Sequence, residues 1–116
     1  MPITIYHNPK CAKSRATLEL LRAHGIEPVI IEYLKNPPDK TTLQRLIKLL
    51  AIAPRDLLRV KEPVYKQAGL ANPKLSNSAI LQALVKYPKL MERPIVVAGN
   101  KAALGRPPEN VLKIIK

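Results

Sequence analysis

The segment ITIYHNPKCAKSRATLELLRAHGIEPVIIEY, residues 3–33, determines the fold expected for this 116-residue chain. β-branched residues alternate along residues 3–6 and predict a strand. Leu and Ala recur through residues 16–23 and predict a helix, which Gly25 can terminate. A continuous β-branched run at residues 29–33 favours a strand buried on both faces of a parallel sheet. The segment therefore predicts a βαβ unit, right-handed by the usual rule.

The middle of the chain predicts helices. Thr41 and Gln44 form a capping-box pattern ahead of apolar residues at helical spacing. Residues 60–74 look irregular. Ser76 is a good N-cap for a further helix, which must end before Pro88.

The C-terminal part predicts the second half of a sheet. Residues 93–98 read as a strand, and Gly99-Asn100 is a hairpin turn signal ahead of a returning strand at residues 101–104. A last helix then has Val111, Leu112 and Ile115 on its apolar side. The expected order is a βαβ half, a helical insertion and a ββα half.

These elements indicate one α/β domain across residues 1–116, with a mixed sheet and a helical insertion at about residues 39–86. A chain of this size buries roughly two thirds of its unfolded surface, which is enough for a core. Hydrophobic residues make up 47% of the chain. We therefore expect it to fold without stabilising disulfides or metals.

The net charge of +12 implies anionic partners: nucleic acid, a membrane surface or small oxyanions. Nucleic acid is disfavoured because the chain has no Trp or Phe for base stacking and none of the double-strand motifs. No apolar run approaches the ~20 residues that span a bilayer, so we expect no membrane contact. The first five residues lack a signal-peptide pattern, and one cysteine forms no internal disulfide. Both features favour the cytoplasm.

Cys11 is the only cysteine, and it lies where the first strand gives way to the first helix. Local signals leave the start of this helix open. Asn8-Pro9 suits the N-cap and first helical position, whereas Ser14 is also a possible N-cap. Either start places the thiol near unpaired N–H groups and the positive end of the helix dipole.

The residues around Cys11 add positive charge. His7, Lys10, Lys13 and Arg15 all lie within four residues of the thiol. Cationic neighbours favour the thiolate, so we predict a lowered pKa for Cys11. The alternative is a buried, inert cysteine, which is common among free cysteines.

The thiolate location is also suited to binding anions, which suggests attack on an oxyanion or a disulfide. The Cys-x5-Arg loop of cysteine-based phosphatases is absent, since residue 17 is Thr. The Cys-x-x-Cys pair of dithiol oxidoreductases is absent too, because residue 14 is Ser. Any reduction by Cys11 therefore needs a second thiol from outside the chain. One Cys and two separated His give no zinc spacing, so no metal is expected.

Several motifs together resemble the glutaredoxin-linked arsenate reductase family, which has a thioredoxin-like fold and is related to Spx-type regulators of RNA polymerase. The resemblance covers essentially residues 3–115. It implies a thioredoxin- or glutaredoxin-like mixed sheet. The motifs are ITIYHNPKCAKSRATLELL (3–21), EYLKNPP (32–38), LLR (57–59), RPIVV (93–97) and GRPPE (105–109).

The resemblance also implies a reaction. Cys11 would be the nucleophile that bonds arsenic, and His7 and Ser14 would help to set the thiolate and its orientation. Glutathione, a co-substrate rather than a bound cofactor, would attack the adduct and reduce arsenic. Glutaredoxin would then remove the glutathione. The fold suggests a monomer.

Three arginines would bind and neutralise the oxygens of arsenate or arsenite: Arg59, Arg93 and Arg106. Guanidinium groups match tetrahedral oxyanions better than lysines do, which agrees with these roles. Pro94 would be the cis-proline beside the active thiol, an assignment that rests on the resemblance.

Two other functions stay open. One is a glutathione-dependent reductase of mixed disulfides, which would need neither Arg59 nor Arg93. The other is an Spx-like regulator that binds RNA polymerase. Such regulators typically sense oxidation with Cys-x-x-Cys, and Ser14 argues against that switch.

Overall fold

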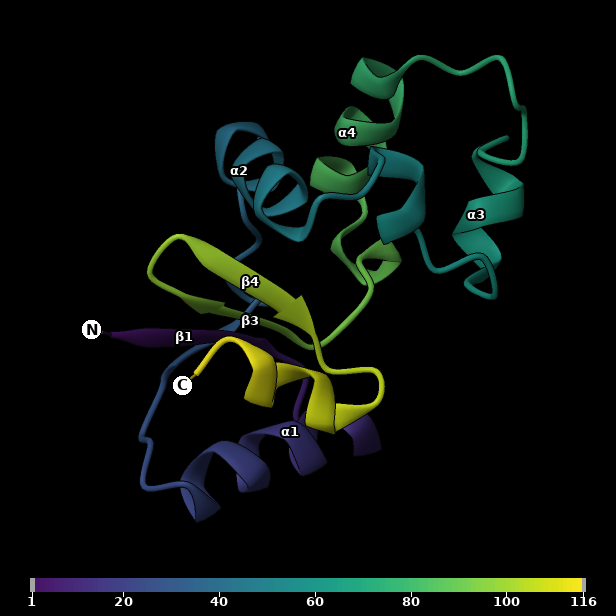
Figure 1. Ribbon diagram of the computed structural model, residues 1–116. Helices are drawn as coiled ribbons and strands as arrows, with labels where there is room; N and C mark the ends of the chain where they lie inside the picture. The colour runs from purple at the N-terminus through teal and green to yellow at the C-terminus, as the bar shows by residue number, and fades with distance from the viewer. Residues whose placement is uncertain (1, 116) are drawn as a thin grey trace. The chain divides into compact units, whose positions relative to one another are not determined.

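The computed structural model describes residues 2–115, which form two compact units (Figure 1). The first unit joins the chain up to Asn36 with the chain from Arg93 onward, and the second is Pro37–Glu92. The second unit contains the segment expected as a helical insertion. That the two units fold as one domain stays a prediction. No helix among residues 2–115 has the length and apolarity needed to cross a bilayer.

The first unit is built on a four-stranded mixed sheet, as predicted. Its strands are β1 (Ile3–His7), β2 (Val29–Glu32), β3 (Ile95–Ala98) and β4 (Lys101–Leu104), and their order is β2-β1-β3-β4. β1 pairs parallel with β2 and antiparallel with β3, and β3 pairs antiparallel with β4. β1 is thus central, and the thiol-bearing loop leaves its carboxyl end.

β2 differs from the expectation. We expected a strand buried on both faces, but Val29 is 55% exposed and Ile30 is 39% exposed. The prediction was wrong because these two neighbouring residues point to opposite faces, so neither face is covered at this point of β2, which is an edge strand of the sheet formed by residues 2–115. β-branched runs fit a pleated surface whether or not both faces are covered.

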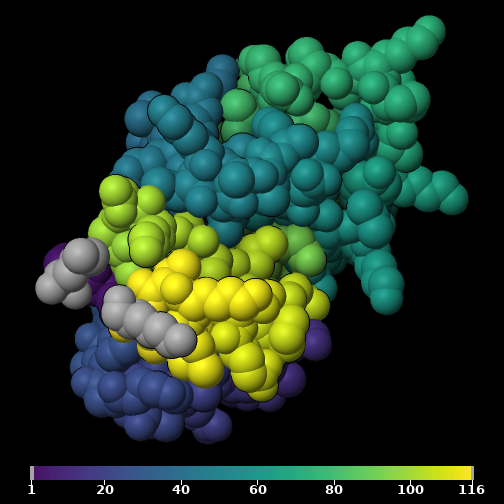
Figure 2. Space-filling view, viewed as in Figure 1, coloured from purple at the N-terminus to yellow at the C-terminus, as the bar shows by residue number. Residues whose placement is uncertain are grey.

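One face of the sheet is covered by α1 (Ala12–Ala23) and the 3₁₀-helix η3 (Pro108–Lys113). α1 ends as predicted, with His24 at the C-cap and Gly25 at φ +77°, a conformation that glycine adopts at little cost. In Figure 2 the yellow C-terminal segment lies against the blue and purple surface of α1.

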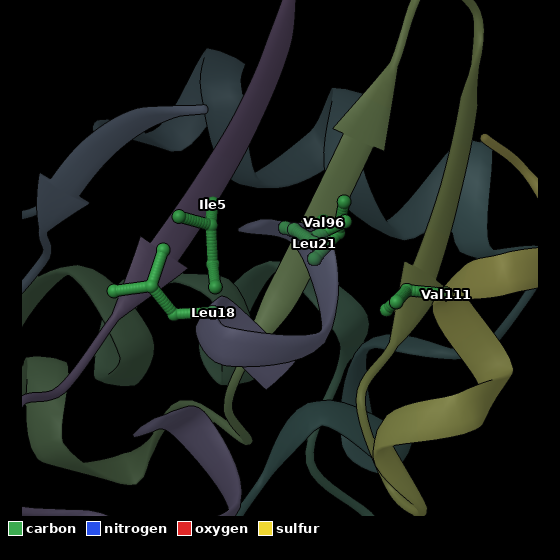
Figure 3. Close-up of a cluster of buried hydrophobic side chains, with 5 residues drawn as sticks. All are labelled: Ile5, Leu18, Leu21, Val96 and Val111. Carbon is green, nitrogen blue, oxygen red and sulfur yellow. The ribbon is translucent and has the colours of Figure 1, made fainter. Parts of the chain in front are cut away.

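The core of the first unit lies between the sheet, α1 and η3 (Figure 3). The last helix was expected to present Val111, Leu112 and Ile115 to this core. Val111 and Ile115 contact it, but with Ile114 in place of Leu112. The difference arises because a 3₁₀-helix has three residues per turn, which aligns positions i and i+3. The buried cluster comprises Ile5, Leu18, Leu21, Val96 and Val111.

The second unit is helical. Its α-helices are α2 (Lys40–Leu50), α3 (Pro63–Gln67) and α4 (Asn77–Lys86), and its 3₁₀-helices are η1 (Pro54–Leu57) and η2 (Pro88–Leu90). α4 contacts α2, η1 and η2, so it is the central helix of this unit. The expectation of an irregular segment at residues 60–74 missed α3, which has only five residues.

The helix starts of this unit were predicted unequally well. Ser76 is the N-cap of α4, because its hydroxyl accepts from the N–H of Ala79 at 3.1 Å, as predicted. The capping box at Thr41 was wrong. The N-cap of α2 lies two residues earlier, at Asp39, whose carboxylate accepts from the N–H of Thr42 at 2.8 Å. Asp is a stronger N-cap than Thr, and Asp39 also lies directly after the proline-rich turn.

Candidate active site

Segments far apart in the sequence leave the sheet of the first unit at one edge. Tyr6 near the end of β1 pairs with Ile95 at the start of β3. β4 is antiparallel to β3, so it ends at the same edge. The chain segments that carry Cys11, Arg93 and Arg106 therefore start from this edge. The edge brings together the predicted nucleophile and two of the three predicted arginines.

The loop after β1 forms a turn before the helix. The N–H of Cys11 donates to the carbonyl of Asn8 at 3.0 Å, and the N–H of Lys10 donates to Asn8 Oδ1 at 3.0 Å. Cys11 itself is the N-cap of α1, and its carbonyl accepts from the N–H of Arg15. Both predicted helix starts were therefore wrong, because Asn8 stabilises the turn and Ser14 lies inside the first helical turn.

The electrostatic surroundings of Cys11 favour the thiolate. Burial raises the pKa of the Cys11 thiol, but the N–H groups of Ser14 and Lys13 and the guanidinium of Arg93 lower it by more. The net shift is downward, in the predicted direction. The thiol is also partly exposed, which argues against the inert alternative. The charge that acts on it comes from Arg93, a residue distant in the sequence.

His7 and Ser14 form a buried hydrogen-bonded pair under the loop. His7 Nδ1 lies 2.6 Å from Ser14 Oγ, which also accepts from the N–H of Asn8 at 3.0 Å. Burial lowers the pKa of His7, and this is the largest effect. The Glu32 carboxylate raises the pKa, whereas Arg15 and Arg22 of α1 lower it further. The imidazole is therefore neutral near pH 7. The expectation that His7 adds positive charge was wrong, because its side chain is buried at the end of β1.

Arg93 and Arg106 are linked through the backbone. Arg106 Nε donates to the carbonyl of Arg93 at 2.9 Å, and the carbonyl of Arg106 accepts from Asn110 Nδ2 at 3.0 Å. Arg93 Nε is buried and makes no hydrogen bond within residues 2–115. One nitrogen of a guanidinium that acts on the Cys11 thiol thus still lacks an acceptor. An oxyanion at this position could supply one.

Two prolines define the backbone around these arginines. The peptide bonds before Pro94 and Pro107 are both cis, and the resemblance implied only the first. The carbonyl of Pro94 accepts from the N–H of Gly105 at 2.9 Å. A Cβ at Gly105 would meet Thr17 Oγ1 and would lie 2.7 Å from Pro94 Cγ. Gly105 therefore permits α1 and the Pro94 turn to approach closely, a role that a glycine directly after a predicted strand could have suggested.

Arg59 belongs to the second unit. Its Nη1 lies 3.3 Å from Glu62 Oε1, and its Nε lies 3.3 Å from Glu92 Oε1. Its N–H donates to the carbonyl of Leu90 at 2.7 Å. Among the predicted arginines, Arg59 is thus held by carboxylates of its own unit. Its role as an oxyanion ligand stays a prediction.

The fold and the site together define the class of this protein. It is a thioredoxin-like α/β protein with one thiol at the N-cap of its first helix, where N–H groups and an arginine favour the thiolate. Residues 6–114 match the model of the ArsC family, and the chain belongs to that family. The predicted family relationship is therefore confirmed.

Relatives of known sequence and structure cover nearly the whole chain. Uncharacterized protein YfgD of Escherichia coli K12 is 54% identical over 114 residues, which are 97% of this chain and 96% of the relative. A Neisseria meningitidis serogroup A protein named arsenate reductase is 47% identical over 114 residues, 97% of each chain. The structure of an arsenate reductase from Vibrio cholerae has a TM-score of 0.97 and 47% identity, over 99% of this chain and 98% of that one.

Proposed function

We propose that this protein reduces arsenate to arsenite. Relatives that bear the name arsenate reductase support the substrate. The observation that carries the proposal is the buried Nε of Arg93, which lacks an acceptor while its guanidinium acts on the Cys11 thiol. An unsatisfied buried donor costs about 1–3 kcal/mol. A tetrahedral oxyanion held for attack by Cys11 accepts from it and removes this cost.

The first step forms a bond between sulfur and arsenic. The Cys11 thiolate attacks arsenic, and one arsenate oxygen takes up protons and leaves as water. Arsenic stays in the +5 state at this stage. Arg93 and Arg106 neutralise the remaining oxygens, since guanidinium groups form paired hydrogen bonds with oxyanions. The Ser14–His7 pair positions the helix turn whose N–H groups favour the thiolate.

The second step needs a thiol from outside, because Cys11 is the only cysteine. The thiolate of glutathione attacks Cys11 Sγ, and the sulfur–arsenic bond breaks. Its electron pair goes to arsenic, which leaves as arsenite in the +3 state. Cys11 and glutathione are left as a mixed disulfide. A glutaredoxin thiolate then takes the glutathione by exchange and releases the Cys11 thiolate.

Arg59 has a conditional role in this scheme. It is paired with Glu62 and Glu92, so it contributes to arsenate binding only by exchanging these carboxylates for arsenate oxygens. The reaction is assigned to Cys11 with Arg93 and Arg106. We assign Arg59 a supporting part in binding the anion.

The test is NADPH consumption coupled through glutathione reductase, with the protein, glutathione, glutaredoxin and arsenate. We expect arsenate-dependent turnover that Cys11→Ser abolishes. Arg93→Ala should lower kcat/KM about ten- to hundredfold, the loss expected for a hydrogen bond to a charged group. Arg22→Ala is the matched control, because Arg22 is paired with Glu27 on the surface.

The competing outcomes are distinct. Turnover that survives in Cys11→Ser would exclude the covalent step. Turnover on glutathionylated peptides but not on arsenate, unaffected by Arg93→Ala, would favour the disulfide reductase instead. Association with RNA polymerase without any turnover would favour the regulator.

A further inference from the structure

A cavity of about 270 Å³ opens at the carboxyl ends of β1 and β2. It is lined by residues 7–10, which lead directly into Cys11, and by Glu32, Leu34 and Lys35 at the end of β2. His7 and Glu32 are register partners in the parallel pair. Ligands of open α/β sheets bind outside the carboxyl ends of the strands. The volume is close to the lower end of the roughly 300–1,000 Å³ of small-molecule sites.

The cavity has a definite pattern of charge. Lys10 and Lys35 contribute two exposed ammonium groups. Glu32 contributes one carboxylate, whose Oε1 lies 3.6 Å from Lys35 Nζ. His7 is neutral, so the lining carries two positive charges and one negative charge. Leu34 is 47% exposed and adds an apolar wall.

We infer that this cavity binds the peptide thiol that resolves the Cys11 adduct. The ligand class is a short peptide with two carboxylates, one ammonium and a thiol, which is the chemistry of glutathione. The charges are complementary once the exposed Glu32–Lys35 pair opens, because Lys10 and Lys35 then match two carboxylates and Glu32 matches one ammonium. The assignment of this ligand rests on the proposed function, which requires a thiol from outside.

The cavity is next to the thiol along the chain. Lys10 lines the cavity and Cys11 is the next residue, so their Cα atoms are about 3.8 Å apart. An extended tripeptide spans about 10 Å. The proposal places its central cysteine against the partly exposed thiol and its charged ends in the cavity. The bond changes are those of the second step above, with no further reactant.

Binding can be tested without turnover. The probe is S-methylglutathione, which carries no thiol, added to ¹⁵N-labelled Cys11→Ser protein and followed by amide chemical shifts. We expect shifts at residues 7–10 and 32–35. Lys35→Glu and, separately, Lys10→Glu should each raise Kd about tenfold, because an attraction becomes a repulsion. Two variants keep the test valid if one of them folds poorly.

Lys101→Glu is the matched control. It changes the net charge equally, but Lys101 pairs with Ala98 at the opposite end of the sheet. It should change Kd less than about twofold. The diethyl ester of the probe should bind the unaltered cavity weakly and should lose its sensitivity to Lys35→Glu. Shifts confined to other residues, or equal weakening by Lys101→Glu and Lys35→Glu, would overturn the assignment.

Kinetics separate this inference from the proposed function. In the coupled assay, Lys35→Glu should raise the KM for glutathione and leave the KM for arsenate unchanged. If arsenate turnover is normal and Lys35→Glu has no effect on the KM for glutathione, the cavity assignment fails and the function stands. If S-methylglutathione binds as expected but arsenate is not reduced, the function fails and the cavity assignment stands.

Discussion

At the scale of single residues, Arg93 is the charged group that lowers the pKa of Cys11. Arg93→Ala removes this cation, so the pKa of Cys11 should rise towards the ordinary thiol value. Only the thiolate reacts with iodoacetamide, and the alkylation rate rises as the pH passes the thiol pKa. The pH profile of the variant should therefore lie at higher pH than that of the wild type.

The control for this experiment is Arg22→Ala, which removes a surface arginine of α1. Its alkylation profile should coincide with that of the wild type. A profile of Arg93→Ala that also coincides with the wild type would show that the guanidinium does not act on the thiol. Cys11→Ser measures the background reaction, since the chain has no other cysteine.

His7 links the stability of the fold to pH. Burial lowers its pKa in the folded state, so below about pH 6.5 the unfolded chain binds a proton that the folded protein does not. The free energy of unfolding should therefore fall as the pH drops from about 6.5 towards the folded pKa of His7. Above about pH 6.5 the contribution of His7 should be constant. Urea unfolding between pH 5 and pH 8 measures the slope.

The matched pair for this prediction is His7→Gln and His24→Gln. Removal of His7 should flatten the dependence between pH 5 and 6.5. Removal of His24, which is exposed at the end of α1, should leave the slope in place. The assignment would be contradicted if His24→Gln abolished the pH dependence and His7→Gln kept it.

At the scale of elements, the contact between α1 and the turn at Pro94 depends on Gly105. Gly105→Ala forces a Cβ against Thr17 and Pro94, and overpacking of this kind costs about 1–3 kcal/mol. The backbone at Gly105 is not in the left-handed region, so the cost is steric. Thermal and urea unfolding should both show the loss of stability.

A second substitution isolates the steric cause. Thr17→Ala removes the Oγ1 atom that the new Cβ would meet, although it also removes the hydrogen bond from Thr17 to the carbonyl of Lys13. In that background Gly105→Ala should cost less, giving a coupling of about 0.5 kcal/mol or more. If the stability losses of Gly105→Ala and Thr17→Ala simply add, the contact with Thr17 is not the cause of the loss in Gly105→Ala.

At the scale of the whole molecule, the chain crosses between the two units twice, after Asn36 and after Glu92. The first unit is made of two segments that are separated in the sequence by the whole second unit. It can therefore form only when the second unit lets these two segments come together. We therefore expect one cooperative unfolding transition. Hydrogen exchange measured on peptides from each unit should lose protection at the same urea concentration.

A mild core change in one unit tests this coupling. Ile80→Val in α4 should cost about 0.5–1.5 kcal/mol and should lower the midpoint of both units together. Ile5→Val in β1 is the equivalent change in the first unit, and it should also lower the unfolding midpoint of both units. A midpoint that falls only in the unit carrying the substitution would mean two independently unfolding domains.

The sequence by itself determined most of the fold. Strand alternation, helix periodicity and turn residues are local signals, so β1, the end of α1, the β3–β4 hairpin and the N-cap of α4 could all be predicted. It also supplied the family and the lone thiol at a strand–helix junction. Helix starts were less well defined because several neighbouring polar residues can each act as N-cap.

Only the tertiary structure decided which residues act on one another. The edge position of β2 follows from strand order, which periodicity does not encode. The pairing of Cys11 with Arg93 and the neutrality of His7 depend on burial and on contacts between segments far apart in the chain. Gly105 matters because two elements meet there. Local sequence sets backbone preference, whereas charge and steric effects depend on distances that exist only after folding.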